Sequence, residues 1–418
     1  MRKVVLAAAI ISMFGCGAKE RYGSGTGGNG NNGNGTGSGG TPAGGGAGGG
    51  PECNQNDQNT DGDGDGYTPA QGDCNDCDPG MNPGAIEIGG NGKDDDCNGQ
   101  IDDNNPACDS ASAGSKDPTE FAHSMEICDP RFFKGAMTAG PSDPQGRNVL
   151  ANLGILMPKA GANFAFLSSG IAVDEKGSGF VNPQEGTDLG NTGTNPLPSL
   201  TGASNCGQAD QTNVHDYTEI VLTLHAPTNV QSFSFDFQFF SGEYPEYVCS
   251  MFNDEFLAVV QSSKTYPTAT NISYDMQQHP ITVNSGFFTV CQNDTSKQQT
   301  QNCTHPPTDN NGTGYETPAG GISIPGLPGG IPGGSTGWLT TTAPIAPNED
   351  ITLRFVIFDE GDGVLDSSVL IDNFQWGAAT VMGPSTGPIG KVDKKIIRHH
   401  FRPTPTPALM CLSPDAHT

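Results

Sequence analysis

Three aspartates, Asp61, Asp63 and Asp65, alternate with glycine in the stretch DGDGDG. Alternating carboxylates that lead into a glycine turn are typical of loops that wrap oxygen ligands around calcium. A second stretch, residues 94–105, repeats the alternation around Gly99. Two such loops within one short segment predict calcium binding. The predicted metal ligands are Asp61, Asp63, Asp65, Tyr67, Asp73, Asp94, Asp96, Asn98, Asp102 and Asn105.

Neither acidic loop follows the EF-hand pattern. Both lack the glutamate expected at the twelfth position, and no amphipathic helix flanks either loop. We therefore expect calcium affinities of about 10⁻⁴ to 10⁻³ M, as in extracellular modules, and a structural role for the metal. Ile101 is expected to point inward as an apolar anchor of the second loop.

The acidic segment, residues 51–109, carries charges that oppose its folding. It has fifteen acidic residues against the single basic residue Lys93, and few apolar residues. Hydrophobic burial alone cannot stabilise so small a segment, so metal ions and covalent staples are expected. The net charge of the whole chain is −27. This charge argues against nucleic acid as a partner and against electrostatic docking on anionic lipid, because both need basic side chains.

Cysteines offer a second kind of staple, and the chain has twelve of them. Export from the cytoplasm favours disulfides over free thiols. The spacing of Cys74 and Cys77 also fits a redox or zinc pair, but there is no second such pair and no histidine nearby. We therefore expect structural disulfides. The candidates are Cys53, Cys74, Cys77, Cys97, Cys108, Cys128, Cys206, Cys249, Cys291 and Cys303.

The amino terminus has the features of an export signal. Two basic residues precede an apolar run too short to span a bilayer permanently, and Gly15 stands immediately before Cys16. The stretch SMFGC resembles a bacterial lipobox, which implies cleavage before Cys16 and lipidation of its sulfur. Gly17 follows instead of aspartate, which favours the outer membrane. An ordinary secretory signal with a free Cys16 is the alternative, and the Gly-rich residues 16–50 predict a disordered tether in either case.

Residues 57–103 resemble the metal-binding motif family named after the surface protein MopE, found in exported proteins of the myxobacterial type. The resemblance rests on the stretch DGDGDGYTPAQGDCNDCDPGMNPGAIEIGGNGKDDDCNGQIDD. It implies a small loop-rich module, loaded with calcium and stapled by disulfides, over residues 51–109. Copper, which the family name suggests, fits less well, because this stretch has no histidine and carboxylate oxygens suit calcium better. Zinc fits less well than calcium too.

Alternation of apolar and polar residues with a period of two appears beyond residue 110. It is clearest at 220–224, 233–239 and 351–357, and the stretches 254–261 and 367–376 are also typical of strands. Helical periodicity is nowhere convincing. We therefore predict a mainly β protein whose major domain is an antiparallel β-sandwich of the jelly-roll type.

Three blocks of this region resemble the choice-of-anchor L domain of bacterial surface proteins. The blocks are NFAFLSSG, FSFDFQFFSGEYPEYVCSMFNDEFLAVV and LRFVIFDEGDGVLDSSVLIDNFQW, and they occur in the family's order across residues 120–378. The resemblance implies a place on the cell surface and a fold, and it implies no particular chemistry.

Acidic residues cluster at the ends of the predicted strands, and neighbouring strands could bring them together as a second calcium site. The alternative is that they are ordinary turn formers. The candidates are Glu243, Asp254, Asp359, Asp362 and Asp366. Tyr244, Tyr247 and Trp338 could form a platform for glycans, but packing in the core is the favoured interpretation.

The remaining segments indicate no chemistry. Residues 304–336 are rich in Gly and Pro and predict a mobile surface loop, and residues 379–418 predict a disordered basic tail. No nucleophile elbow, zinc-protease motif or phosphate loop occurs, so no catalytic residue is proposed.

These observations favour a cell-surface-anchored, calcium-binding, non-enzymatic protein for binding, adhesion or matrix. Its expected partners are the membrane, through the N-terminal lipid, and an extracellular glycan or surface protein. A surface polysaccharide hydrolase and a purely structural envelope component are the alternatives.

Overall fold

The computed structural model describes residues 57–103, 112–140, 144–201, 212–294, 301–318 and 330–389. The predicted signal peptide, tether and lipidation site at Cys16 lie outside these ranges. The predicted disordered tail, residues 379–418, lies outside them from residue 390 onward. Its described part contains a strand, Ser385–Pro388, that pairs with Leu339–Pro344, so the prediction of disorder is wrong there. Four further predicted site residues also lie outside them, namely Cys53, Asn105, Cys108 and Cys206.

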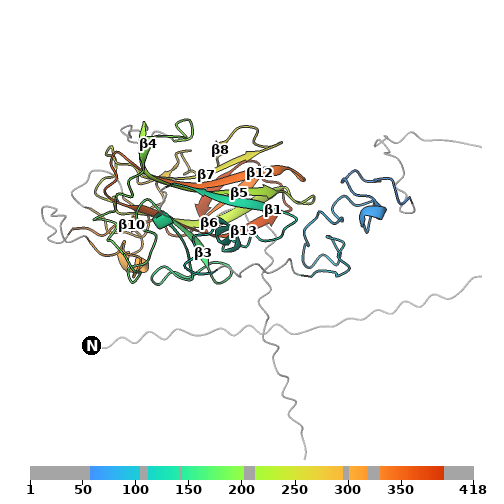
Figure 1. Cartoon of the computed structure of the whole chain (residues 1–418), viewed down its shortest axis with the longest axis horizontal. Helices are drawn as coiled ribbons and strands as arrows, with labels where there is room; N and C mark the ends of the chain where they lie inside the picture. Colours follow the sequence, from blue (N-terminus) through green and yellow to red (C-terminus); the bar gives the residue numbers. More distant parts are fainter. Residues whose placement is uncertain are drawn as a thin grey trace, which may run out of the picture. The chain divides into compact units, whose positions relative to one another are not determined.

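Two antiparallel sheets dominate the described chain (Figure 1). The first sheet has the order β1 (Phe133–Ala139), β5 (Asn213–His225), β12 (Asp350–Glu360), β7 (Glu255–Ser262) and β8 (Thr270–Asn271), with β4 (Thr192–Thr194) beside β5 and β9 (Ile281–Thr282) beside β7. The second has the order β14 (Ser385–Pro388), β11 (Leu339–Pro344), β6 (Ser232–Ser241), β13 (Ser367–Gly377), β3 (Phe164–Ser168) and β2 (Arg147–Leu150), with β10 (Gly334–Ser335) beside β6.

The strands are connected as in a jelly roll. From β5 to β7, and again from β11 to β13, each successive strand lies in the opposite sheet. The pairing is nested, because β3 pairs with β13, β5 with β12, β6 with β11 and β7 with β8. A long hairpin rolled up on itself gives this nesting. The predicted fold class, mainly β with an antiparallel sandwich, is confirmed.

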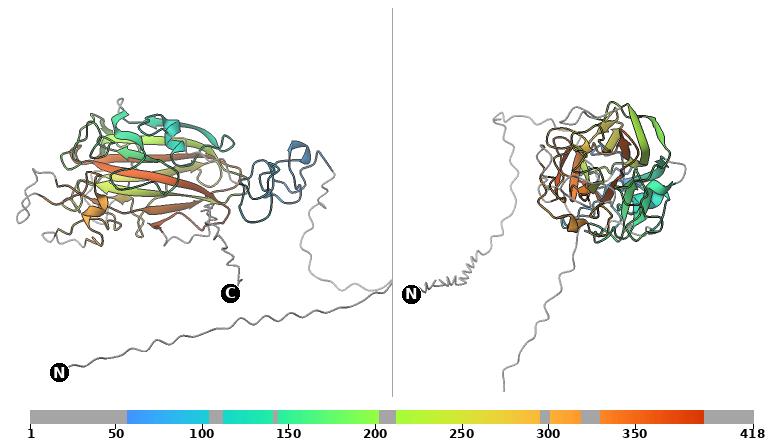
Figure 2. Two further views of the ribbon diagram at one scale, coloured as in Figure 1. Left: turned by 90° about the horizontal axis from the view of Figure 1, so that it is seen from below. Right: turned by 90° about the vertical axis from the view of Figure 1, so that its left-hand side faces the viewer.

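The core fills the space between the sheets, whose long strands run side by side in Figure 2. The ring of Phe235 on β6 meets Phe355 on β12 at a centroid distance of 4.9 Å, and Phe237 meets Phe256 on β7 at 5.0 Å. All four rings are fully buried. Aromatic pairs of this kind contribute about 0.5–1.5 kcal/mol beyond the burial of their surface. The alternation found in the sequence therefore marks the inner faces of the strands.

The outer face of β6 is also covered, which the alternation does not predict. Every residue of β6 is buried, and a second apolar cluster around Phe166, Phe240 and Leu370 lies outside the second sheet. Tyr315 belongs to this cluster and is 1% exposed. The prediction that residues 304–336 form a mobile surface loop is therefore wrong around Tyr315, because the chain covers a sheet face there.

Helices are short in the described chain. They are α1 (Pro118–His123) and the 3₁₀ turns η1 (Pro69–Gln71), η2 (Pro144–Gly146) and η3 (Pro307–Asn310). Asp117 caps α1 by accepting a hydrogen bond from the Thr119 N–H at 2.8 Å, and Phe121 packs into the main core. None of the described helices has the length and apolar character that crossing a bilayer requires.

Candidate functional site

The first acidic loop brings its three aspartates together. Carboxylate oxygens of Asp61, Asp63 and Asp65 all lie within 4.8 Å of one another. Asp61 closes the loop by accepting hydrogen bonds from the backbone N–H groups of Gly64 at 2.6 Å and Gly66 at 3.0 Å. Both glycines have positive φ, 85° and 100°, a conformation that other residues adopt at a cost. The glycines therefore allow the carboxylates to face one another.

Three carboxylates at this loop each have one oxygen that the protein leaves without a hydrogen-bond donor. One oxygen of Asp63, one of Asp65 and one of Asp73 are buried and accept no hydrogen bond from the protein. Burial raises the pKa of Asp65 to about 6, and it also raises the pKa of Asp63 and Asp73, with further contributions from the neighbouring carboxylates. Asp73, a predicted ligand, thus lies close to the loop. A cation with oxygen ligands would relieve both the repulsion and the missing hydrogen bonds.

Tyr67, another predicted ligand, contributes to the first loop through its backbone. Its N–H donates to a carboxylate oxygen of Asp65 at 2.7 Å. The phenol ring lies against Gly84, where a Cβ atom would come within 2.5 Å of the Tyr67 hydroxyl oxygen. The side chain of Tyr67 is therefore used for packing within the module.

The second acidic region gathers a different set from the predicted one. Its converging carboxylates are Glu87, Asp96 and Asp103, whose oxygens lie within 4.8 Å of one another. Of these, the sequence pattern identified Asp96 alone. Glu87 is 1% exposed and accepts hydrogen bonds from the backbone N–H groups of Asp95 at 3.1 Å and Asp102 at 3.2 Å. Burial raises the pKa of Glu87, although backbone donors oppose the shift.

The other predicted ligands of this region form hydrogen bonds within its turns. Asp94 accepts from the N–H groups of Asn98 at 3.0 Å and Gly99 at 2.9 Å, as Asp61 does in the first loop. Asp102 accepts from the N–H groups of Asn91 and Gly92, at 2.9 and 3.0 Å. The Asn98 side chain donates to Asp103 at 3.3 Å.

The prediction that Ile101 is an inward anchor is wrong. Its side chain is 64% exposed, because the small module offers no apolar interior to receive it. The buried isoleucine of the module is Ile86, which is 7% exposed and belongs to the main core of the sandwich.

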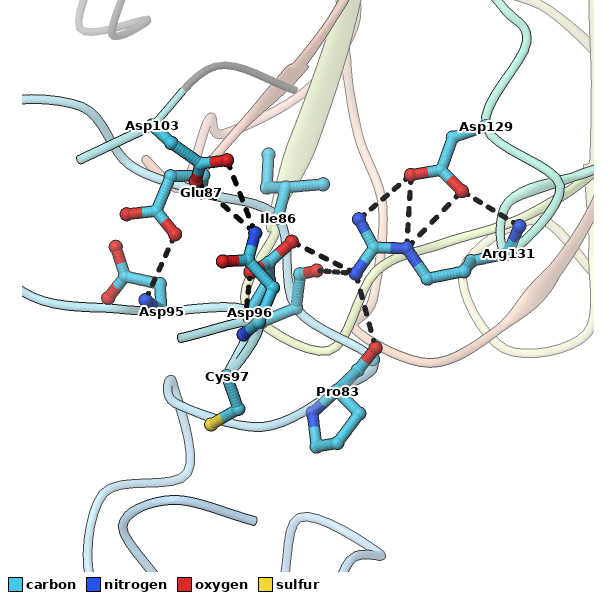
Figure 3. A network of polar contacts seen from close by, with 12 residues as sticks. Pro83, Ile86, Glu87, Asp95, Asp96, Cys97, Asp103, Asp129 and Arg131 are labelled. Carbon is cyan, nitrogen blue, oxygen red and sulfur yellow. Dashed lines mark hydrogen bonds and ion pairs between the residues drawn. The ribbon is translucent and has the colours of Figure 1, made fainter. Parts of the chain in front are cut away.

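Arg131 lies beside the second carboxylate group (Figure 3). Its guanidinium lies 3.2 Å from a carboxylate oxygen of Asp96 and 2.8 Å from one of Asp129, and it also donates to the Pro83 and Ala85 carbonyls at 3.3 Å. A positive charge is therefore already present beside Asp96. No arginine or lysine makes an ion pair with the Asp61, Asp63 and Asp65 group within the described ranges, so the first loop is the better metal candidate.

Disulfides hold the two acidic regions together. Cys74 is bonded to Cys97, which closes a loop across a sequence separation of 23 residues. Cys77 is disulfide-bonded as well, so the alternative of a Cys74–Cys77 redox or zinc pair is not supported. Cys128 and Cys249 also form disulfides, and Cys291 is bonded to Cys303. The metal-ligand atoms that the two carboxylate groups offer are all oxygens, which suits calcium better than copper or zinc.

The acidic residues predicted for a second calcium site lie at one end of the sandwich. Glu243, Asp254, Asp359 and Asp366 are 0–3% exposed, and Asp362 is half-buried. Burial, followed by the charges of Asp254 and Asp366, raises the pKa of Asp359 well above its ordinary value. Burial also raises the pKa of Asp254, to about 7.

The aromatic residues considered for a glycan platform pack within the fold. Tyr244 is 4% exposed and stacks on Phe288 with a centroid distance of 4.0 Å. Trp338 packs against the second apolar cluster. Tyr247, half-buried, meets Phe252 edge to face. The favoured interpretation, packing, therefore holds for these side chains.

Two family models match the chain. A model described as "Choice-of-anchor L domain" covers residues 152–375, and one described as "Putative metal-binding motif", of the MopE type, covers residues 73–103. No curated protein and no solved structure matches the chain. The metal-binding match contains Asp73 and the Glu87, Asp96 and Asp103 group, and it begins after the first acidic loop.

Proposed function

The chain belongs to the choice-of-anchor L family, and from this we propose that it is a non-enzymatic binding or matrix protein of the cell surface. The family indicates a surface-associated protein. To this we add an outer-membrane anchor on Cys16, drawn from the lipobox-like sequence, and a module stiffened by calcium. An extracellular glycan or another surface protein would be the partner.

The observation that carries the calcium proposal is the convergence of Asp61, Asp63 and Asp65. Three carboxylates within 4.8 Å repel one another, and two of them have a buried oxygen without a donor. Hard oxygen ligands of this kind suit calcium. Because the module has little apolar surface to bury, the ion would contribute to its folding directly.

Burial of the sandwich carboxylates supports a non-enzymatic role. A glycosidase needs a pair of carboxylic groups that flank a substrate bound from solvent. Glu243, Asp254 and Asp359 are at most 2% exposed, so a polysaccharide could not reach them in this conformation.

Metal analysis tests the calcium proposal. We would purify the exported chain, measure bound metal by elemental analysis, and record thermal melting with calcium and with EDTA. Wild type should retain calcium and melt at a lower temperature after chelation. Asp61→Asn should lose at least one calcium equivalent, because it removes one of the converging charges. Asp57→Asn is the matched control, since Asp57 is exposed and outside the converging group. Copper or zinc in place of calcium, or equal metal content in both variants, would count against the proposal.

Anchoring and binding need separate experiments. Cys16→Ser should abolish labelling by a radioactive fatty acid and release the protein from the membrane fraction, and unchanged labelling would exclude the lipid. The soluble chain should bind polysaccharide or whole cells. Release of reducing sugar would favour the hydrolase, and the absence of any binding would favour a purely structural component.

A further inference from the structure

One end of the sandwich collects carboxylates from both sheets. Glu243 follows β6 and Asp254 precedes β7, while Asp359 is the last residue but one of β12 and Asp366 precedes β13. The ends of β6 and β13 meet in the second sheet, and those of β7 and β12 meet in the first. The β6–β7 and β12–β13 connections therefore cross between the sheets at the same end.

These carboxylates lie in the interior, and among the described residues no basic side chain makes an ion pair with them. The charges that act most strongly on Glu243, Asp254 and Asp359 are those of other carboxylates. Transfer of an ionised carboxylate from water into a protein interior is strongly unfavourable unless an opposite charge or a proton compensates it. Some positive species must therefore neutralise this end of the sandwich.

The carboxylates differ in how well the protein itself satisfies them. Asp254 accepts from the Ser367 hydroxyl at 2.6 Å and from the Glu360 N–H at 3.3 Å. Neither oxygen of Asp359 accepts a hydrogen bond of good geometry, although the Ser169 hydroxyl lies close enough to lower the pKa of Asp359, and one oxygen of Glu243 has no donor. Both side chains are at least 98% buried. The unsatisfied oxygens thus belong to the two carboxylates next to Asp254.

The surrounding backbone leaves room for the cluster. At Gly170 a Cβ atom would lie 1.8 Å from a carboxylate oxygen of Asp366, so no larger residue fits while Asp366 holds its position. Asp366 itself accepts from the Thr187 N–H at 2.9 Å. Glycine at position 170 therefore leaves the space that the buried carboxylate of Asp366 occupies.

We propose that Glu243, Asp254 and Asp359 bind a calcium ion that joins the two sheets at this end. Asp254 is within hydrogen-bonding reach of both of the others, so the three meet as two pairs that share Asp254. Among the described residues, closed triples of carboxylates within 4.8 Å occur only in the acidic module. A cation would draw the two pairs into one ligand set, whereas shared protons would keep them as pairs. Calcium suits this oxygen set, and its flexible coordination tolerates mixed ligand geometry.

The test removes the contribution of the first acidic loop, and the Glu87, Asp96 and Asp103 group stays the same in every chain that is compared. In a full-length chain carrying Asp61→Asn, Asp63→Asn and Asp65→Asn, here called the module-blank chain, bound calcium is measured by elemental analysis with and without an added Asp359→Asn change. The added change should remove one calcium equivalent. Asp188→Asn, at an exposed position of the sandwich, is the matched control and should remove none. Equal calcium content with and without Asp359→Asn would overturn the proposal in favour of shared protons.

A second measurement avoids any change to the buried acids. Tyr247 donates its N–H to the Glu243 carbonyl at 2.9 Å, so its ring can sensitise terbium bound nearby. The module-blank chain should show terbium emission that calcium displaces and that falls in Tyr247→Phe or in Tyr315→Phe, because the charges of Asp254 and Asp359 also act on Tyr315. Emission that depends on neither tyrosine would overturn the proposal. Neither result bears on calcium in the acidic module, which the Asp61→Asn experiment tests separately.

Discussion

At the scale of single residues, the sandwich contains a buried aspartate, Asp372, whose surroundings disfavour the ionised form. Asp372 on β13 is fully buried and lies opposite Asp236 on β6. Its carboxylate accepts hydrogen bonds from the backbone N–H groups of Lys159, Ala160 and Asn373. Burial nevertheless raises the pKa of Asp372 to about 7, and the charge of Asp236 adds to the shift. The nearby Lys159 opposes it, with its amine over the Trp338 ring.

The raised pKa of Asp372 predicts a pH dependence of stability. The folded protein holds this proton more tightly than the unfolded chain, whose Asp pKa is about 3.9. The protonated Asp372 therefore contributes its full share to the unfolding free energy below about pH 4. This contribution is lost as the pH rises toward 7, at up to about 1.4 kcal/mol per pH unit. Asp372→Asn should flatten the fall in unfolding free energy between pH 5 and 7, measured by urea denaturation. Glu185→Gln, at an exposed position, should leave the wild-type slope intact. Parallel curves for wild type and Asp372→Asn would contradict this assignment.

The sequence predicts those contacts of the candidate metal sites that join residues close in sequence, and it misses the contacts between distant residues. Asp61 and Asp94 stand three to five residues before the N–H groups they accept from, so spacing alone reveals their loops. Glu87 is outside any alternating pattern and reaches Asp96 and Asp103 through the folding of the module. Arg131 is a still more distant contact of Asp96. A pattern of spacing contains no information about such partners.

At the scale of elements, the strands are predictable where one face is apolar and the other polar. β5, β6, β7, β12 and β13 all coincide with predicted segments. The strands β2, β3 and β11 are short or apolar on both faces, so alternation does not reveal them. The covering of β6 by the segment around Tyr315 is also hidden, because Gly and Pro dominate the sequence near that residue.

Tyr315 gives a test of that covering segment. Its ring packs on Phe240 with a centroid distance of 5.2 Å, and its hydroxyl donates to the Ser368 hydroxyl at 2.7 Å. Tyr315→Ala should lower the unfolding free energy by about 3–5 kcal/mol, as for other large aromatic deletions in cores. Tyr315→Phe should cost about 1–2 kcal/mol through the lost hydrogen bond. Met276→Ala, at a side chain 82% exposed, should change little. If Tyr315→Ala is as mild as Met276→Ala in chemical denaturation, the segment is the loose loop that its composition suggests.

At the scale of the whole molecule, the acidic module is bonded to the sandwich by side chains far apart in sequence. Ile86 enters the main core, and its backbone exchanges two hydrogen bonds with the Asn229 side chain, at 3.0 and 2.7 Å. The N–H of Thr228 donates to the Gly84 carbonyl at 3.0 Å. Arg131 adds its contacts with Asp96 and with the carbonyls of the module. The change in composition predicts two separate domains here. The contacts between them cannot be recognised from spacing in the sequence.

These contacts predict that amides of the module are less protected against hydrogen exchange when the Asn229 side chain is removed. Asn229→Ala deletes both partners of the Ile86 backbone, and such a loss costs about 1–3 kcal/mol when the groups stay buried. Hydrogen exchange should therefore quicken by roughly tenfold or more at Ile86 and its neighbours, because 1.4 kcal/mol corresponds to a factor of ten. Amides in β5, β6 and β12 should keep their protection, since they lie in the sheets. Asn152→Ala, at an exposed asparagine, should leave the module unchanged. Equal loss of protection in the module and in the sheets would mean that the two parts unfold as one unit, and the acidic module would then depend on the sandwich as much as on any metal ion.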